Sequence, residues 1–245
     1  MITQRRDGDV TVIQIDRHER RNALDAEHCD ALRAEVEAAA AGGARAITIT
    51  GAGSSFCAGA DLGGVYGAGF RGSLHGMLSA ITEVAIPVIA AVNGPAIGAG
   101  TQLAIACDLR VAAPRARFAV PTARNGLAVD PWTVRRLALL AGGATARALL
   151  IGCETLDAER ALTRGLADRP GELGDALDWA RELATLAPLA LAYSKLALAE
   201  LLERPGDGSP STRLLTAFEA CWSSTDLIEA ERARTERRAP VFRGH

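Results

Sequence analysis

The sequence contains few aromatic residues, no basic tract and no long apolar run. Phe, Trp and Tyr together make up 4% of the 245 residues, and the formal net charge is −2. Scarce aromatic rings argue against modules that bind nucleic acid by base stacking. The charge argues against a surface for nucleic acid or anionic membranes. Because no apolar run approaches the roughly 18 residues of a transmembrane helix, we expect no membrane span.

The cysteines also lack a pattern that would indicate a metal site or a disulfide framework. Five of them are scattered through the chain, without a CxxC motif or a Cys/His cluster, at Cys29, Cys57, Cys107, Cys153 and Cys221. We therefore expect no structural zinc site and no other bound metal. An odd number of scattered cysteines is typical of reduced thiols, and the N-terminus does not resemble a signal peptide. These features predict a cytoplasmic protein.

What the sequence does contain is apolar material arranged in short periodic segments. Hydrophobic residues make up 49% of the chain, enough for a sizeable core. Residues 10–15, 46–50, 87–92 and 108–113 read as strands, and a helix is expected over 26–40. Asp25 is its predicted N-cap and Gly42-Gly43 its predicted end. Strands separated by helices predict right-handed crossovers and a covered, mostly parallel sheet of the α/β class.

Two later stretches differ from this alternation. Residues 63–76 contain several glycines and are predicted to form a loop, followed by a helix to about Ala85. After Val129 the pattern becomes helical, with segments expected over 134–141, 144–150, 157–163, 175–187, 189–202 and 212–236. The predicted organisation is an α/β core over residues 1–187 and a helical oligomerisation region over 188–245.

Two turns of small residues follow two of the predicted strands. Residues 54–62 (SSFCAGADL) follow the strand at 46–50, and residues 93–102 (NGPAIGAGTQ) follow the strand at 87–92. Ligands commonly bind at the carboxyl ends of strands in α/β sheets, and small side chains let them approach the backbone. Two backbone N–H groups can then converge on one oxygen and form an oxyanion hole. The same glycines and alanines are also compatible with tight packing turns that bind nothing.

Several motifs in order resemble those of the crotonase superfamily, the enoyl-CoA hydratase/isomerase proteins. They are RNALD, FCAGADL, PVIAAVNGPAIGAG, CDLRVAA, RFAVPTARNGLAVD and the ending RRAPVFRGH. The resemblance spans essentially the whole chain and is similar to that of actinobacterial paralogues. It implies a spiral of ββα units with a C-terminal helical trimerisation region, assembled as a trimer or hexamer. It also implies an acyl-CoA ligand in lipid metabolism, with its thioester oxygen held by the N–H groups of Ala60 and Ala99.

The family's two catalytic glutamates are absent from the matching positions. Gln102 stands at the first position and Thr122 at the second. Glutamine cannot usefully transfer a proton and threonine is a poor base, whereas each such acid or base contributes about 10²- to 10⁴-fold in rate. The sequence therefore predicts an acyl-CoA-binding protein with weak or absent hydration and no cofactor apart from the CoA of its ligand.

Two alternatives remain open at this point. Residual hydration through a water held by Gln102 is one. The other is an isomerase or hydrolase that uses Asp130, because dienoyl-CoA isomerases and 4-chlorobenzoyl-CoA dehalogenases carry an aspartate at about this position. Asp130 also precedes Pro131 and could simply cap the following helix.

The resemblance also implies contacts to the CoA part of the ligand. Arginines suit its phosphates, and backbone groups would meet its adenine and pantetheine. The residues implicated near the start of the chain are Arg20, Arg21, Ala23, Ala58, Asp61 and Leu62. Arg237 and Phe242 resemble a C-terminal basic and aromatic tail that reaches the CoA of a neighbouring subunit.

Overall fold

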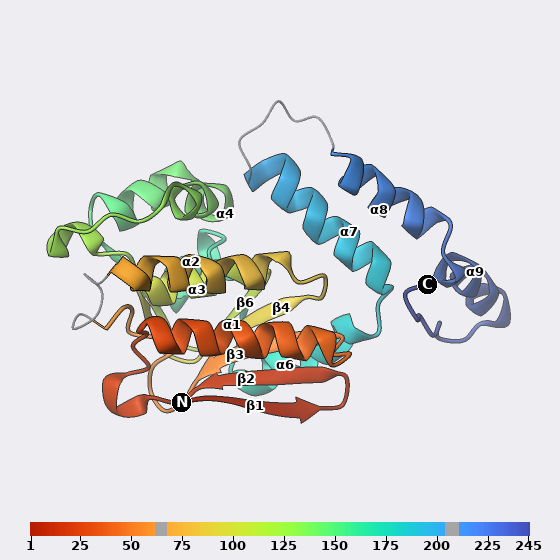
Figure 1. The fold of residues 1–245 in the computed structure, drawn as a ribbon, viewed down its shortest axis with the longest axis horizontal. Coiled ribbons are helices and arrows are strands. Elements are labelled where there is room, and N and C mark those ends of the chain that lie inside the picture. Colours follow the sequence, from red (N-terminus) through yellow and green to blue (C-terminus); the bar gives the residue numbers. More distant parts are fainter. Residues whose placement is uncertain (62–67, 204–210) are drawn as a thin grey trace.

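The computed structural model describes residues 1–61, 68–203 and 211–245, and it contains two sheets with helices around them (Figure 1). The larger sheet has the strand order β1 (Ile2–Asp7), β2 (Val10–Ile15), β3 (Ala46–Gly51), β4 (Val88–Val92), β6 (Leu109–Ala112) and β9 (Arg169–Pro170). Only the pairing of β1 with β2 is antiparallel among these. A smaller sheet contains β5 (Pro95–Ile97), β7 (Arg117–Ala119) and β8 (Thr155–Asp157).

Helices connect the strands and cover the larger sheet. They are α1 (Ala26–Ala41), α2 (Ala68–Glu83), α3 (Ala99–Ala106), α4 (Pro131–Leu150), α5 (Ala158–Thr163) and α6 (Leu173–Ala184), with short turns η1 (His18–Arg20) and η2 (Thr122–Asn125). Apolar residues from α1, α2 and α3 pack on one face of the sheet, and those of α6 pack on the other. Strand β3 is buried along its whole length, which explains its run of β-branched residues. The predicted α/β class is confirmed.

The local signals at helix ends were reliable. Asp25 is the N-cap of α1, where its carboxylate accepts a hydrogen bond from the N–H of His28, and α1 ends at Gly42. The loop predicted for residues 63–76 was wrong from Ala68 onward, because α2 begins there. Buried residues such as Phe70, Met77 and Ile81 stabilise this glycine-rich helix against the core, so packing overrides the low helix propensity of glycine.

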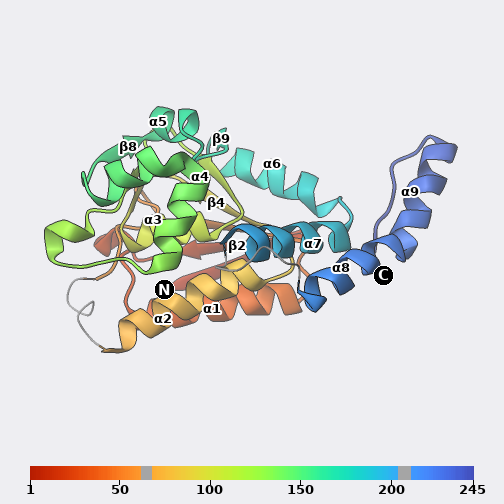
Figure 2. The same cartoon turned by 90° about the horizontal axis from the view of Figure 1, so that it is seen from above.

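The C-terminal region extends from one end of the molecule, as Figures 1 and 2 both show. It contains α7 (Pro188–Leu198), a π-helical turn η3 (Ala199–Glu203), α8 (Thr212–Trp222) and α9 (Thr225–Glu236). The single helix predicted over 212–236 was wrong, because the chain breaks at Ser223 and Ser224. The hydroxyl of Ser224 accepts the N–H of Leu227 and donates to the carbonyl of Cys221, and such local bonds compete with the helix ladder.

The helices at 134–141 and 144–150 were predicted separately, and they are the two arms of α4, which kinks at Gly142 with a φ of 79°. In the described residues, no single helix is long and apolar enough to cross a bilayer. Helix α6 together with residues 188–202 meets that criterion only as a pair bent by 110°.

Candidate functional site

The two predicted turns of small residues pack directly against each other. A methyl group added to Gly94 would lie 2.1 Å from the carbonyl oxygen of Ser54, and one added to Gly100 would lie 2.1 Å from that of Cys57. A methyl on Gly59 would meet the carbonyl oxygen of Ile97 at 2.7 Å and the nitrogen of Ala99 at 3.8 Å. Glycine is therefore required by close backbone approach between the turns at these three positions.

Ala60 and Ala99 both adjoin this contact, because Ala60 directly follows Gly59 and the nitrogen of Ala99 is 3.8 Å from a methyl on Gly59. Leu24 donates its N–H to the carbonyl of Gly59 and accepts the N–H of Asp61, so the Ala60 amide is left between two bonded groups. Ala99 is the first residue of α3, whose first-turn amides have no intrahelical acceptor. Within the described part of the chain, neither amide has a hydrogen-bond acceptor. Such donors can hold a carbonyl oxygen or an anion.

Two asparagine side chains form hydrogen bonds with the backbone carbonyls of the turn that follows β3. The side-chain amide of Asn22 donates to the carbonyls of Ala52 and Ser55 at 2.9 and 2.7 Å. The side-chain amide of Asn93 donates to the carbonyls of Gly51 and Gly53 at 2.9 and 3.0 Å. The turn geometry is thus fixed by side chains that come from outside it.

Gln102 extends from α3 one turn beyond Ala99 and is 5% exposed. Its Nε2 donates to Oδ2 of Asp130 at 3.0 Å and to Oγ1 of Thr133 at 2.8 Å. Asp130 is the N-cap of α4, and its carboxylate also accepts the N–H of Thr133 at 3.0 Å and the Thr133 hydroxyl at 2.6 Å. The interpretation of Asp130 as a helix cap is confirmed. The structure adds a contact with Gln102 that the sequence did not indicate.

Thr122 begins the short turn η2 and is half-buried. Its chain position follows β7, whose last residue Ala119 accepts hydrogen bonds from the N–H of Gly98 and the hydroxyl of Thr101. Trp132 and His75 line a cavity of about 270 Å³ between α2 and the start of α4. Its lining mixes polar side chains such as Ser79, Thr82 and Glu83 with apolar ones, and it reaches α4 at Trp132, two residues after Asp130.

The residues expected to contact CoA near the start of the chain lie together. Arg20 and Arg21 are exposed, and Ala23, Ala58 and Asp61 are half-buried. The carbonyl of Arg21 accepts the N–H of Ala58 at 3.0 Å, which joins the two segments. The predicted contact at Leu62 lies outside the described residues. Arg17, which sequence reasoning did not identify, forms an ion pair with Asp61 at 2.9 Å.

Arg237 and Phe242 are not brought to this region within one chain. They belong to the C-terminal tail, at the opposite end of the molecule from η1 (Figure 1). The tail folds back on α9, where Asp226 accepts the N–H groups of Arg243 and Gly244. A side-chain hydrogen bond from Arg45 to the carbonyl of Phe242, at 3.1 Å, ties the tail to the core.

The other end of α3 is covered by guanidinium groups. Arg110, 1% exposed, donates to the carbonyl of Cys107 at 2.8 Å and pairs with Asp168 at 3.0 Å. Arg136 donates to the carbonyls of Ile105 and Cys107. Burial, followed by the nearby charge of Arg110, lowers the pKa of Arg136 to about 10. These groups satisfy the last carbonyls of the helix.

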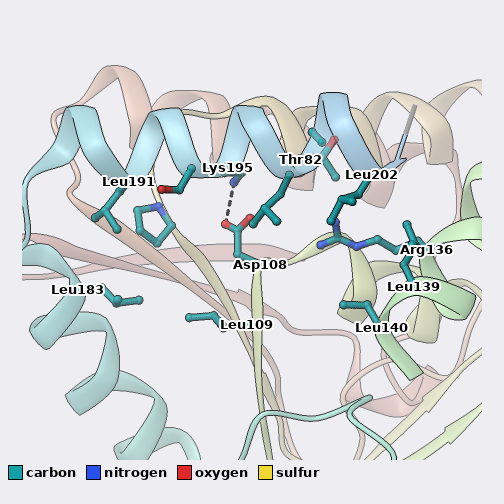
Figure 3. Close-up of a pocket in the computed structure, with 14 residues that line it drawn as sticks. Thr82, Asp108, Leu109, Arg136, Leu139, Leu140, Leu183, Leu191, Lys195 and Leu202 are labelled. Carbon is teal, nitrogen blue, oxygen red and sulfur yellow. Dashed lines mark hydrogen bonds and ion pairs between the residues drawn. The ribbon is translucent and has the colours of Figure 1, made fainter. Parts of the chain in front are cut away.

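A second cavity lies beyond that end, between α4, α6 and α7. It measures about 310 Å³, and leucines make up half of the residues that line it (Figure 3). Lys195 pairs with Asp108 at 2.8 Å and also donates to the carbonyls of Ile81 and Ile86. Because its three protons are all used, Lys195 has none left for an anionic head group. Among the described residues, no group of His, Cys, Asp and Glu side chains could hold a metal ion.

Comparisons with known proteins agree over nearly the full length. The profile of a family described as enoyl-CoA hydratase/isomerase matches residues 5–245. A probable enoyl-CoA hydratase, echA6, from Mycobacterium tuberculosis is 46% identical over 241 residues, which are 96% of each chain. A carnitinyl-CoA dehydratase from Citrobacter koseri is 37% identical over 213 residues, 82% of each chain.

The fold is also found in solved structures. An enoyl-CoA hydratase/carnithine racemase from Magnetospirillum magneticum superposes with a TM-score of 0.90 at 26% identity, covering 100% of this chain and 96% of the other. The crotonase-like architecture expected from the motifs is therefore confirmed.

Proposed function

The chain belongs to the enoyl-CoA hydratase/isomerase family of acyl-CoA metabolism, and we propose that it binds an acyl-CoA thioester while hydrating it weakly or not at all. The observation that carries this proposal has two parts: in the described residues the N–H groups of Ala60 and Ala99 have no acceptor, and the Gln102 side chain is bound to Asp130 and Thr133. The first feature supports a grip on the thioester oxygen. The second supports a lack of proton transfer.

The grip is chemically suited to a thioester. Two aimed backbone donors polarise the carbonyl, and in a dry site one such donor is worth about 3 kcal/mol toward an enolate or tetrahedral oxyanion. In the ground state the same donors orient the acyl group. The exposed guanidinium groups of Arg20 and Arg21 supply positive charge for the phosphates of CoA, and no other cofactor is required.

Hydration, in contrast, needs groups that move protons. Both Nε2 protons of Gln102 are donated to Asp130 and Thr133, and an amide does not release them at neutral pH. Thr122 offers only a hydroxyl. Loss of one general acid or base corresponds to about 10²- to 10⁴-fold in rate, or roughly 3–5 kcal/mol of barrier, so losing two leaves little turnover.

A catalytic alternative is supported by the position of Asp130. Its contact with Gln102 brings a carboxylate within one side chain of the α3 N-terminus, where it could serve an isomerase or hydrolase. Three hydrogen bonds occupy that carboxylate, however, and leave about one of its four lone-pair sites for an incoming proton. The similarity to a hydratase and a dehydratase supports hydration, rather than isomerisation or hydrolysis, as the catalytic alternative.

We further propose that the chain assembles as a homotrimer or a pair of trimers in the cytoplasm. In the described part of residues 188–245, nine large apolar side chains are exposed: Leu198, Leu201, Leu202, Leu215, Phe218, Trp222, Leu227, Ile228 and Val241. Such a surface on a helical extension favours burial against copies of the same chain. In that assembly Arg237 and Phe242 would contact the CoA of a neighbouring subunit.

The test combines calorimetry over a chain-length series of acyl-CoAs with a hydration assay on the same preparation. We expect binding without loss of the enoyl-thioester absorbance. A triple variant, Gln102→Glu, Thr122→Glu and Asp130→Asn, should gain at least about 10²-fold in hydration. The change of Asp130 to asparagine keeps a capping side chain on α4 and avoids a second carboxylate beside the glutamate introduced on α3.

The control is Gln4→Glu, a matched change at an exposed position of β1, which should leave hydration unchanged. Efficient hydration by the natural chain that Gln102→Ala abolishes would reject the proposal. Turnover of any acyl-CoA that disappears in Asp130→Asn would favour the catalytic alternative.

A further inference from the structure

The predicted site is built on two chain segments that are far apart in sequence. We name residues 17–25 the cradle segment, because it carries Arg20 and Arg21, and residues 57–61 the donor segment, because it carries Ala60. Three backbone hydrogen bonds of 2.7–3.0 Å join them: Ala58 to Arg21, Leu24 to Gly59, and Asp61 to Leu24. The position of the Ala60 N–H therefore depends on the cradle segment.

A single guanidinium group adds side-chain bonds to this junction. Arg17 pairs with Asp61 through Nη2 at 2.9 Å, and its Nη1 donates to the carbonyl of Ala23 at 3.0 Å. The same Nη1 lies 3.3 Å from a carboxylate oxygen of Asp25. Arg17 is 18% exposed and Asp61 is 25% exposed. A planar, partly buried guanidinium that reaches three acceptors holds their relative positions in a way that a flexible ammonium does not.

The charges around Arg17 explain why its loss should be felt at Ala60. Asp25 is fixed independently, because it caps α1 by accepting the N–H of His28 at 2.9 Å and faces the His28 ring at 2.7 Å. Asp61 is the residue next to Ala60, and it contacts Nη2 of the guanidinium whereas Asp25 contacts Nη1. Removing the cation would leave two half-buried carboxylates near each other without the positive charge between them. Because Asp25 is fixed by the α1 cap, we expect the resulting shift to fall on the donor segment.

We propose that Arg17 is a positioning residue that sets the direction of the Ala60 N–H relative to that of Ala99. The inference rests on the proposed function, since it assumes that these two amides grip a thioester oxygen. Arg17 itself touches no ligand in this scheme. It acts on carbonyl polarisation through Asp61 and the donor segment, whereas the phosphates of CoA are contacted by other residues.

The experiment uses an acyl-CoA whose thioester is conjugated to an aryl-substituted double bond, because its absorbance shifts to the red when the carbonyl is polarised. Arg17→Gln should reduce the red shift of the bound probe by at least about half and weaken its binding about tenfold, or 1.4 kcal/mol. Free CoA should bind within about threefold of the natural chain. Arg17→Lys should recover only part of the shift.

Arg33→Gln is the control, because Arg33 is also an arginine in an ion pair, with Glu37 at 2.7 Å, but on the exposed side of α1. It should change neither the shift nor the affinity. If Arg17→Gln fails to fold, Asp61→Asn tests the same ion pair while keeping Arg17. We expect this variant to reduce the absorbance shift as well.

The possible failures are distinguishable. If the natural chain neither binds the probe nor shifts its absorbance, the proposed function is wrong. If the natural chain shifts the probe and both Arg17→Gln and Asp61→Asn give the same shift, only the role of Arg17 is wrong.

Discussion

The two ends of helix α3 are treated in opposite ways. At its start, the N–H of Ala99 has no acceptor in the described structure, and the surroundings are small residues in backbone contact. At its end, the carbonyls of Ile105 and Cys107 accept hydrogen bonds from Arg110 and Arg136, both of which are largely removed from water.

Within the eight residues of α3, one end therefore contributes to the stability of the fold and the other end is the proposed place of ligand binding. Satisfied carbonyls at the far end anchor the helix to α4, β6 and the residues around Asp168. At the near end, the N–H of Ala99 has no acceptor among the described residues, which is the arrangement that the proposed ligand contact needs. Substitutions at the two ends should therefore affect different measurements.

The largest expected effect is at the anchored end. Arg110→Met removes a 1% exposed guanidinium, which donates to the carbonyls of Leu166 and Cys107 and forms the ion pair with Asp168. We expect the free energy of unfolding to fall by about 3–5 kcal/mol, measured by urea denaturation. Arg147→Met, an exposed arginine on α4 that also donates to a carbonyl, should change it by less than about 0.5 kcal/mol. Equal losses in both variants would contradict the comparison.

A substitution at the N-terminal end of α3 should reduce stability less than Arg110→Met does, and it should also weaken ligand binding. Gly100→Ala places a methyl 2.1 Å from the carbonyl oxygen of Cys57, so the two turns must separate. We expect a loss of about 2–3 kcal/mol in stability and at least tenfold in acyl-CoA affinity, measured by calorimetry. Gly69→Ala, in an open part of α2, should instead stabilise the chain by up to about 1 kcal/mol. Unchanged affinity in Gly100→Ala would remove the distinction between the ends.

The smallest expected effect is on the pH dependence of stability, through the buried thiols of Cys57 and Cys107 near the two ends of α3. Burial raises the pKa of Cys57, near the start of α3, and of Cys107, at its end, to about 12 from 9.0. The unfolded chain therefore loses these protons first, and stability present below pH 9 declines as pH rises toward 12, by about 1.4 kcal/mol per unit for each thiol. Denaturation at pH 8 and 10 should show a shallower decline in Cys57→Ala and in Cys107→Ala alike. A decline unaltered by Cys57→Ala would mean that water reaches the thiol behind the site.

Sequence reasoning was most successful where a local rule applies. The caps at Asp25 and Asp130, the end of α1 at Gly42 and the central strands follow from residue types and short periods. The three-residue strands β5, β7 and β8 were missed because tertiary pairing forms them. The helix start at Ala68 was missed because packing outweighs the propensity of its glycines.

At the candidate site, too, sequence reasoning found the features that depend on local residue types and missed the contacts between distant residues. The small residues of both turns identified the place where the backbone comes close, since only glycine fits at Gly59, Gly94 and Gly100. Partners across long separations carry no local signal: Arg17 and Asp61 are 44 residues apart, and Gln102 and Thr133 are 31 apart. The roles of Ala60, Ala99 and the CoA-contacting residues stay predictions.

The two asparagines that hold the turn after β3 affect which substitutions the site can accept. Asn22 and Asn93 each use both side-chain amide protons on its carbonyls, from outside. The main-chain frame is therefore maintained by residues distinct from Gln102, Thr122 and Asp130. Substitutions at those three positions can therefore change the reactive groups while the hydrogen bonds that hold the backbone of the turn are kept.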